Sequence, residues 1–165
     1  MAQISDPKKL FQHELGMALG AERKVLTTLR KLERRAQRDQ LKQQFHHHRE
    51  ETEGQIKNLQ QALQALGGRA GAHDADSANG IAAEGEKLME KVGNDLIDAV
   101  LLGAAAKTEH VEIAMYEGLI TKAEAMGARE IVSLLQENLE QEKHTLEEVK
   151  TASESLSKEL ATQTA

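Results

Sequence analysis

Residues 45–55 read Phe-His-His-His-Arg-Glu-Glu-Thr-Glu-Gly-Gln, a stretch that places His48 and Glu51 on the apolar face of a predicted helix. Residues three apart share one face of a helix, so these two side chains point the same way. Apolar residues flank them on both sides of the same face: Leu41, Phe45, Ile56, Leu59, Leu63 and Leu66. Because an ionised group in a dry core costs several kcal/mol unless it is paired or metal-bound, this stretch needs a partner for its charge.

Three other apolar stripes are interrupted in the same way, at Glu22, at Glu109 with Glu112, and at Glu142. Glu109 and Glu112 also have the three-residue spacing. One such glutamate pair on a helix is usually solvated or salt-bridged, but four interruptions in one small domain call for a common explanation. A shared cation between the helices provides it.

The four stripes predict four long helices, over residues 6–37, 40–66, 95–126 and 128–160. The first begins at Ser5-Asp6-Pro7, a capping residue followed by proline at the first helical position. Asp39 is expected to cap the second helix, and glycines at 67–68 and 127 end the second and third. A crossover over 67–93 is expected to be a polar loop with one short helix at 81–92. Residues 161–165 are expected to fray.

Two hairpins with short loops, joined by one long crossover, are typical of the ferritin-like four-helix bundle, so the sequence predicts an all-α fold with a single domain over residues 1–165. In an antiparallel hairpin, residues equidistant from the turn lie at one height. Glu112 and Glu142 are equidistant from Gly127, and Glu22 and Glu51 are equidistant from the expected turn near residue 37. Each hairpin is therefore expected to bring one pair of carboxylates level.

The candidate ligands are five carboxylates and one imidazole: Glu22, His48, Glu51, Glu109, Glu112 and Glu142. Such a hard, oxygen-rich set suits iron or manganese and argues against copper or a thiolate-type zinc site. Two divalent ions would balance four or five negative charges. The sequence therefore predicts a two-metal site, with iron as the preferred ion and manganese as the alternative.

Composition narrows the remaining function classes. The 165 residues carry a net charge of -6 and include no cysteine, which excludes disulfides, thiolate catalysis and iron-sulfur ligation. A negative net charge does not provide the positive surface that binds the phosphates of nucleic acid. The first residues lack the pattern of a secretory signal, and no apolar run approaches the length of a membrane span, so a cytoplasmic protein without membrane or nucleic-acid partners is expected.

The positions of other residues near the predicted site follow from the helix face that each one occupies. His46 and His47 point away from His48 around the helix and are expected in solvent. Tyr116, one turn after Glu112, is expected either to pack in the core or to lie near the metals as an electron or hydrogen-bond donor. Three methionines fall at core spacing: Met17, Met115 and Met126.

Four motifs resemble the YciE/YciF family of bacterial ferritin-like proteins, over about residues 5–152. They are Phe45-x-x-His48-x-x-Glu51-Thr52-Glu53-Gly54-Gln55, Glu109-His110-x-Glu112-Ile113-Ala114, Leu139-x-x-Glu142-Lys143, and Leu10-Phe11-x-His13-Glu14-Leu15 with Ala21-Glu22. The pair Glu109-x-x-Glu112 also looks like the third-helix pair of rubrerythrins. The resemblance implies a bacterial stress-response protein, ferroxidase-like diiron chemistry and a homodimer.

The chain departs from that family pattern in its last helix. Gln141 and Leu146 stand where the family often has acidic residues. Helix 40–66 carries His48-x-x-Glu51, the reverse of the general Glu-x-x-His order. A lopsided site is therefore expected, with one metal position weaker or more open than the other.

The leading hypothesis is an oxidoreductase of ferroxidase or peroxidase type, whose partners are Fe(II) and dioxygen or hydrogen peroxide. Glu112 and either Glu22 or Glu51 would bridge the ions, with His48, Glu109 and Glu142 as terminal ligands. No catalytic residue beyond the ligands and no organic cofactor is expected. The alternatives are peroxide dismutation of the manganese-catalase kind and a non-catalytic helical module with a degenerate site.

Overall fold

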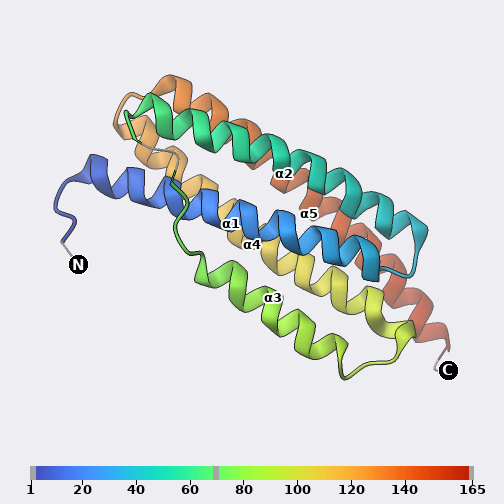
Figure 1. Ribbon diagram of the computed structural model, residues 1–165. Helices are drawn as coiled ribbons and strands as arrows, with labels where there is room; N and C mark the ends of the chain where they lie inside the picture. Colours follow the sequence, from blue (N-terminus) through green and yellow to red (C-terminus); the bar gives the residue numbers. More distant parts are fainter. Residues whose placement is uncertain (1–2, 69–70, 164–165) are drawn as a thin grey trace.

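The computed structural model describes residues 3–68 and 71–163, which form five α-helices and one short 3-10 turn (Figure 1). The helices are α1 (Pro7–Arg35), α2 (Asp39–Ala65), α3 (Asp76–Met89), α4 (Ile97–Ala125) and α5 (Arg129–Gln163), and the turn η1 (Asn94–Leu96) precedes α4. Within these residues no strand is present. The predicted all-α class is therefore confirmed.

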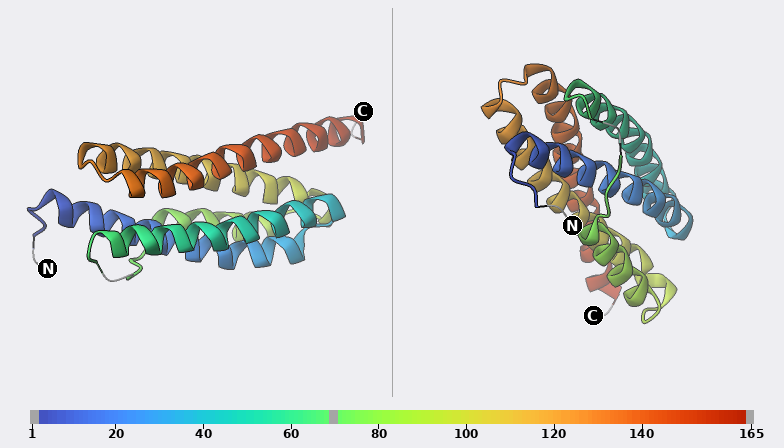
Figure 2. Two further views of the ribbon diagram at one scale, coloured as in Figure 1. Left: turned by 90° about the horizontal axis from the view of Figure 1, so that it is seen from above. Right: turned by 60° about the vertical axis from the view of Figure 1, so that its left-hand side comes forward.

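The helices are arranged as two hairpins that pack together. Helix α1 pairs with α2, α4 pairs with α5, and the two hairpins meet through α2 against α5 and α1 against α4 (Figure 2). Helix α3 lies outside these four, along the side formed by α1 and α4 (Figure 1). This is the expected ferritin-like four-helix bundle, with an extra helix in the crossover. No helix within the described ranges is long and apolar enough to cross a membrane.

Helix α1 begins where the sequence predicts, because the Asp6 carboxylate accepts a hydrogen bond from the Lys8 N–H at 2.9 Å. Gly67 and Gly127 follow α2 and α4 with φ of 74° and 67°, the left-handed conformation that glycine adopts without steric cost. Four of the five helices therefore have bounds close to those predicted, with α5 continuing to Gln163 through residues expected to fray.

The bounds of the crossover helix were predicted wrongly. Helix α3 begins at Asp76, not at residue 81, and ends at Met89. An interior glycine costs a helix only about 1 kcal/mol, so Gly80 does not delay its start, and Asp76 in the first turn favours the helix dipole. Helix α4 was also expected to use Asn94 or Asp95 as its cap, but both lie in η1 and α4 starts at Ile97.

The predicted cap of α2 is also incorrect, because Asp39 is the first helical residue and its side chain does not cap the helix. The turn between α1 and α2 is instead held from α4. The buried carboxylate of Asp98 accepts hydrogen bonds from the backbone N–H groups of Gln37 at 2.7 Å and Arg38 at 3.1 Å. A residue distant in sequence therefore fixes this hairpin.

A polar layer divides the core into two apolar clusters. One cluster includes Leu19, Leu59, Tyr116 and Leu139, and the other includes Val25, Phe45, Ala105 and Val149. Five of the six predicted metal ligands are buried but belong to neither apolar cluster, and every helix of the bundle contributes at least one of them: Glu22, His48, Glu109, Glu112 and Glu142.

The methionine prediction is only partly correct. Met17 and Met126 are exposed, at 42% and 40%, while Met115 is partly buried against the first cluster. Met17 lines a groove formed by α1, α4 and residues 74–77, and its side chain is exposed there.

Candidate metal centre

Four of the six predicted ligands meet in the interior. His48 on α2, Glu109 and Glu112 on α4, and Glu142 on α5 each offer one ligand atom, and these atoms all lie within 4.8 Å of one another. All four residues are buried. The three-residue spacing on α4 places two carboxylates on one face. Pairing of α4 with α5 in one hairpin brings Glu142 to them, and packing of the other hairpin brings His48.

The donor atoms of this cluster fit a cation. The ring nitrogens of His48 lie 3.6 Å from a Glu109 oxygen and 3.7 Å from a Glu142 oxygen. Both carboxylate oxygens of Glu109, Glu112 and Glu142 are buried without a hydrogen-bond partner. Buried polar atoms are normally satisfied, so six unpartnered oxygens facing one another are explained by a metal ion that they would share.

Glu22 lies beside this cluster but is not part of it. Its carboxylate is fully buried, and one oxygen accepts a hydrogen bond from the Tyr116 hydroxyl, while the other has no partner. Burial, and then the charge of Glu142, raise the pKa of Glu22 well above its ordinary value. Glu22 is therefore placed to complete the ligand set from α1.

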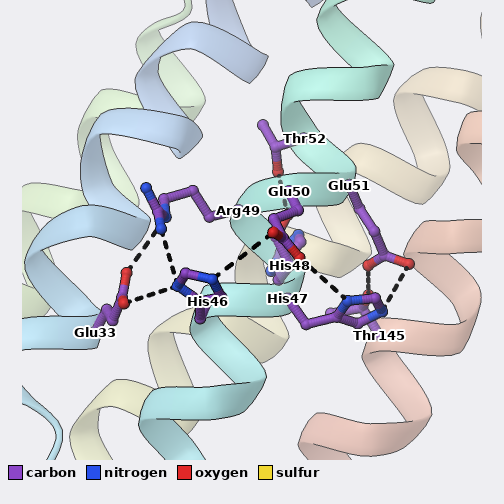
Figure 3. A network of polar contacts seen from close by, with 9 residues as sticks. All are labelled: Glu33, His46, His47, His48, Arg49, Glu50, Glu51, Thr52 and Thr145. Atoms are coloured by element: carbon purple, nitrogen blue, oxygen red, sulfur yellow. Dashed lines mark hydrogen bonds and ion pairs between the residues drawn. The ribbon is translucent and has the colours of Figure 1, made fainter.

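The carboxylate of Glu51 is directed at Thr145 and at His47 (Figure 3). One of its oxygens accepts a hydrogen bond from the Thr145 hydroxyl at 3.3 Å, and the other lies 3.5 Å from a ring nitrogen of His47. Its side chain is 16% exposed. The two carboxylates expected to be level, Glu22 and Glu51, are therefore in different surroundings, one in the dry interior and one at the surface.

The other two histidines of the tract lie in solvent, as expected. His46 contacts Glu33, Arg49 and Glu50, and His47 contacts Glu50 and Glu51 (Figure 3). The hydroxyl of Thr52 is used locally, since it donates to the backbone carbonyl of His48. The backbone of α2 thus directs one imidazole inward and two outward.

The pKa values of the carboxyls in the cluster are shifted in different directions. Burial, followed by the charges of neighbouring carboxylates, raises the pKa values of Glu109 and Glu112 well above the ordinary range. Burial also opposes ionisation of Glu142, but His48 and Glu109 outweigh it, so the pKa of Glu142 lies below its ordinary value. The raised pKa values favour the protonated forms of Glu109 and Glu112 in the metal-free cluster, and a bound cation would displace such protons.

Sequence reasoning missed a set of neutral polar residues next to the cluster. Asn138 donates from its amide nitrogen to the Tyr116 oxygen at 3.0 Å and to the Gln55 backbone carbonyl at 3.3 Å. Asn58 donates to the Asn138 carbonyl oxygen at 2.8 Å. The signal was present, because Asn138 interrupts the stripe of α5 one turn before Glu142. Tyr116 packs in the core, as expected, and its hydroxyl donates to Glu22, one of the predicted ligands.

Comparisons with known proteins identify relatives along the whole bundle. The family model of a domain of unknown function, DUF892, matches residues 6–162. Protein YciF of Escherichia coli is 37% identical over 138 residues, which cover 82% of this chain and 83% of YciF.

Solved structures agree with this relationship. The crystal structure of the Escherichia coli stress protein YciF has a TM-score of 0.88 and 32% identity, covering 94% of this chain and 99% of that one. YcfI of Rhodopseudomonas palustris, for which a structural role has been suggested, has a TM-score of 0.87 and 30% identity, covering 90% and 96%. A protein of Xanthomonas campestris, with a TM-score of 0.76, 21% identity and coverage of 96% and 98%, shares the fold.

Proposed function

This chain belongs to the DUF892 family, and on that premise we propose that it is a stress-related dimetal-carboxylate protein that oxidises Fe(II) with dioxygen or hydrogen peroxide. The observation that carries the proposal is the buried group of His48, Glu109, Glu112 and Glu142 with its unpartnered oxygens. The stress role follows the description of its relative YciF as a stress protein.

His48, Glu109 and Glu142 are proposed as terminal ligands, and Glu112 with Glu22 as the bridging carboxylates. Glu22 is preferred to Glu51 as the second bridge because it is fully buried beside the cluster, whereas Glu51 already engages Thr145. Iron held there would supply electrons, two Fe(II) ions reducing one dioxygen to hydrogen peroxide with the uptake of two protons. The raised pKa values of Glu109 and Glu112 in the metal-free cluster mean that ion binding would release protons from these carboxyls.

The remaining residues position and protect this centre. Tyr116 fixes one oxygen of Glu22, and Asn138 fixes the hydroxyl of Tyr116. The two apolar clusters on either side exclude bulk water from the polar layer. Glu51, exposed on one side and close enough for its charge to act on Glu109, is proposed to receive cations from solvent.

We propose that two copies of the chain form a homodimer through the groove between α1 and α4. Its lining includes the exposed side chains of Met17 and Val111, which a second copy would cover. Sedimentation of the wild-type protein and of Val111→Lys tests this, with a dimer expected for the first and a monomer for the second. A monomeric wild type would contradict it.

The function is tested by loading the purified protein with Fe(II) in the absence of oxygen, counting bound iron, and then adding air. We expect near two ions per chain and a near-ultraviolet oxo-iron absorption band that develops with oxygen. Glu112→Ala is expected to lose at least one ion, while Glu117→Ala, an exposed glutamate on the same helix, keeps both.

The outcomes separate the alternatives. Bound manganese and oxygen release from peroxide without a reductant would favour dismutation. A protein that binds neither iron nor manganese and develops no band would contradict both catalytic functions and support a structural role like that suggested for YcfI.

A further inference from the structure

A cavity of about 50 Å³ lies beneath the crossover helix, between α1, α3 and α4. Most of its wall is aliphatic, including Val25, Leu29 and Leu101. Two of its buried lining residues are His48 and Glu109, members of the metal cluster. The cavity therefore connects the underside of α3 with the candidate centre.

The size of the cavity selects small molecules. One water needs about 10–15 Å³ measured in this way, whereas pockets for drug-sized ligands have about 300–1,000 Å³. The cavity under α3 is thus large enough for a molecule of a few atoms and too small for an organic substrate. An aliphatic wall offers few hydrogen bonds, so such a cavity favours apolar gases over water or hydrogen peroxide.

The charge at the mouth excludes cations. The lining residues nearest to solvent include Lys24, Lys31 and Arg35 from α1, against the single carboxylate of Glu86 from α3. Glu86 is itself paired with Lys31 at 2.7 Å. A divalent cation approaching this mouth meets net positive charge and is repelled. Fe(II) and the second reactant therefore need separate routes.

We infer that this cavity is a dioxygen site, through which dioxygen reaches the His48 and Glu109 side of the metal cluster. The inference rests on the proposed function for the use that is made of the gas, but the binding of a small apolar molecule is independent of any metal. Because the wall of the cavity is aliphatic, the oxidant that enters from this side is dioxygen and not hydrogen peroxide.

The cavity is covered by a helix that can be altered without touching a ligand. Ala82 on α3 lines the cavity, and its neighbour Ala83 is exposed. Along Asp76–Met89 no residue is buried, so a change on α3 leaves the main core intact. Ala82→Val adds two carbons to the cavity, and Ala83→Val makes the same chemical change on the outer face of the same helix.

Xenon is the probe, because it occupies dry apolar cavities of proteins. We expect xenon-129 NMR under pressure to detect binding to the wild type and Ala83→Val, and a several-fold loss of binding in Ala82→Val. Co(II) binding should be equal in all three proteins. Oxidation of bound Fe(II) at low dioxygen concentration should slow several-fold in Ala82→Val alone, while oxidation by added hydrogen peroxide stays equal.

Two results would overturn the inference: no xenon binding by the wild type, or unchanged dioxygen kinetics in an Ala82→Val protein that has lost xenon binding. If neither Co(II) nor Fe(II) binds, the proposed function is contradicted, and so is the delivery of dioxygen to a metal centre. Because xenon binding needs no metal, the two failures are distinguishable. Circular dichroism of each variant checks that it is folded.

Discussion

The hydroxyl of Tyr116 on α4 donates a hydrogen bond to the carboxylate of Glu22 on α1, which joins the two hairpins inside the bundle. The Tyr116 oxygen in turn accepts from Asn138 on α5. Burial, and then the charge of Glu22, raise the pKa of Tyr116, so the phenol stays a donor. Three helices thus meet at one hydroxyl, and Glu22 is held in place before any ion is bound.

Tyr116→Phe removes this hydroxyl and leaves a carboxylate oxygen and an amide hydrogen of Asn138 short of a partner. Unsatisfied buried groups cost about 1–3 kcal/mol each, so for these two groups we expect the free energy of unfolding of the metal-free protein to fall by about 2–6 kcal/mol. Urea denaturation followed by circular dichroism measures it. An unchanged midpoint and slope would contradict the structural role of the hydroxyl.

Glu112→Gln removes a buried charge whose two oxygens lack hydrogen-bond partners. Glutamine removes the repulsion between Glu112 and the neighbouring carboxylates of Glu22 and Glu142, so the metal-free variant should melt at or above the wild-type temperature near neutral pH. Addition of Fe(II) or Mn(II) should stabilise the wild type but not the variant. Glu117→Gln, exposed on the same helix, serves as the control and should behave as wild type. A metal-dependent rise in the melting temperature of Glu112→Gln would remove Glu112 from the ligand set.

The stability of the metal-free protein should fall as pH rises above about 4.5. Burial raises the folded-state pKa values of Glu22, Glu109 and Glu112 above the ordinary value of 4.5, so above that pH the folded state holds more protons than the unfolded one. The stabilisation that these three carboxyls contribute to the folded state is fully present below their unfolded-state pKa. It is lost as pH rises through their folded-state pKa values. The pH dependence of the stabilisation contributed by Glu142 is opposite in sign. Its folded-state pKa is lowered, so its contribution is lost as pH falls.

Thermal unfolding after chelation, measured between about pH 5 and pH 8, tests this expectation. The variant with glutamine at all three positions should show a smaller decline than the wild type, since the difference between the two curves isolates the three carboxyls. Equal slopes in both proteins would show that these groups do not hold protons in the folded state.

Asp98→Ala should destabilise the turn between α1 and α2. The Asp98 carboxylate is 3% exposed and accepts from two backbone N–H groups. Hydrogen bonds to a charged group contribute about 1.5–3 kcal/mol each, so for the two bonds we expect a loss of about 3–6 kcal/mol in the free energy of unfolding. Chemical denaturation checks it, with Asp95→Ala as the exposed control that should cost little.

Glu51→Gln should slow metal uptake without abolishing it. Glu51 is partly exposed and acts electrostatically on Glu109, whereas its neighbour Glu50 is exposed and contacts His46 and His47. We expect stopped-flow Co(II) binding to be several-fold slower in Glu51→Gln and unchanged in Glu50→Gln, because only the first removes charge beside the cluster. Equal rates in the two variants would place the cation route elsewhere.

The family resemblance read from the motifs is confirmed, and so is the helical bundle. Helix starts and ends followed from local signals such as Asp6, Pro7 and Gly127, because a cap or a left-handed turn acts on its own few residues. Local signals failed for the start of the crossover helix, and they failed at Asp39 because the turn before α2 is held by Asp98 of α4 and not by a local cap.

By itself, the sequence determined four amphipathic helices, their hairpin order, and the level at which ionisable groups interrupt each apolar stripe. Those properties depend on helical periodicity and on distance along the chain. Only the tertiary structure decided which groups converge: His48, Glu109, Glu112 and Glu142 meet, Glu22 is held by Tyr116, and Glu51 turns to Thr145 at the surface. The physical reason is that periodicity fixes the face of a helix a residue occupies, whereas the contacts between helices depend on side-chain packing across the bundle.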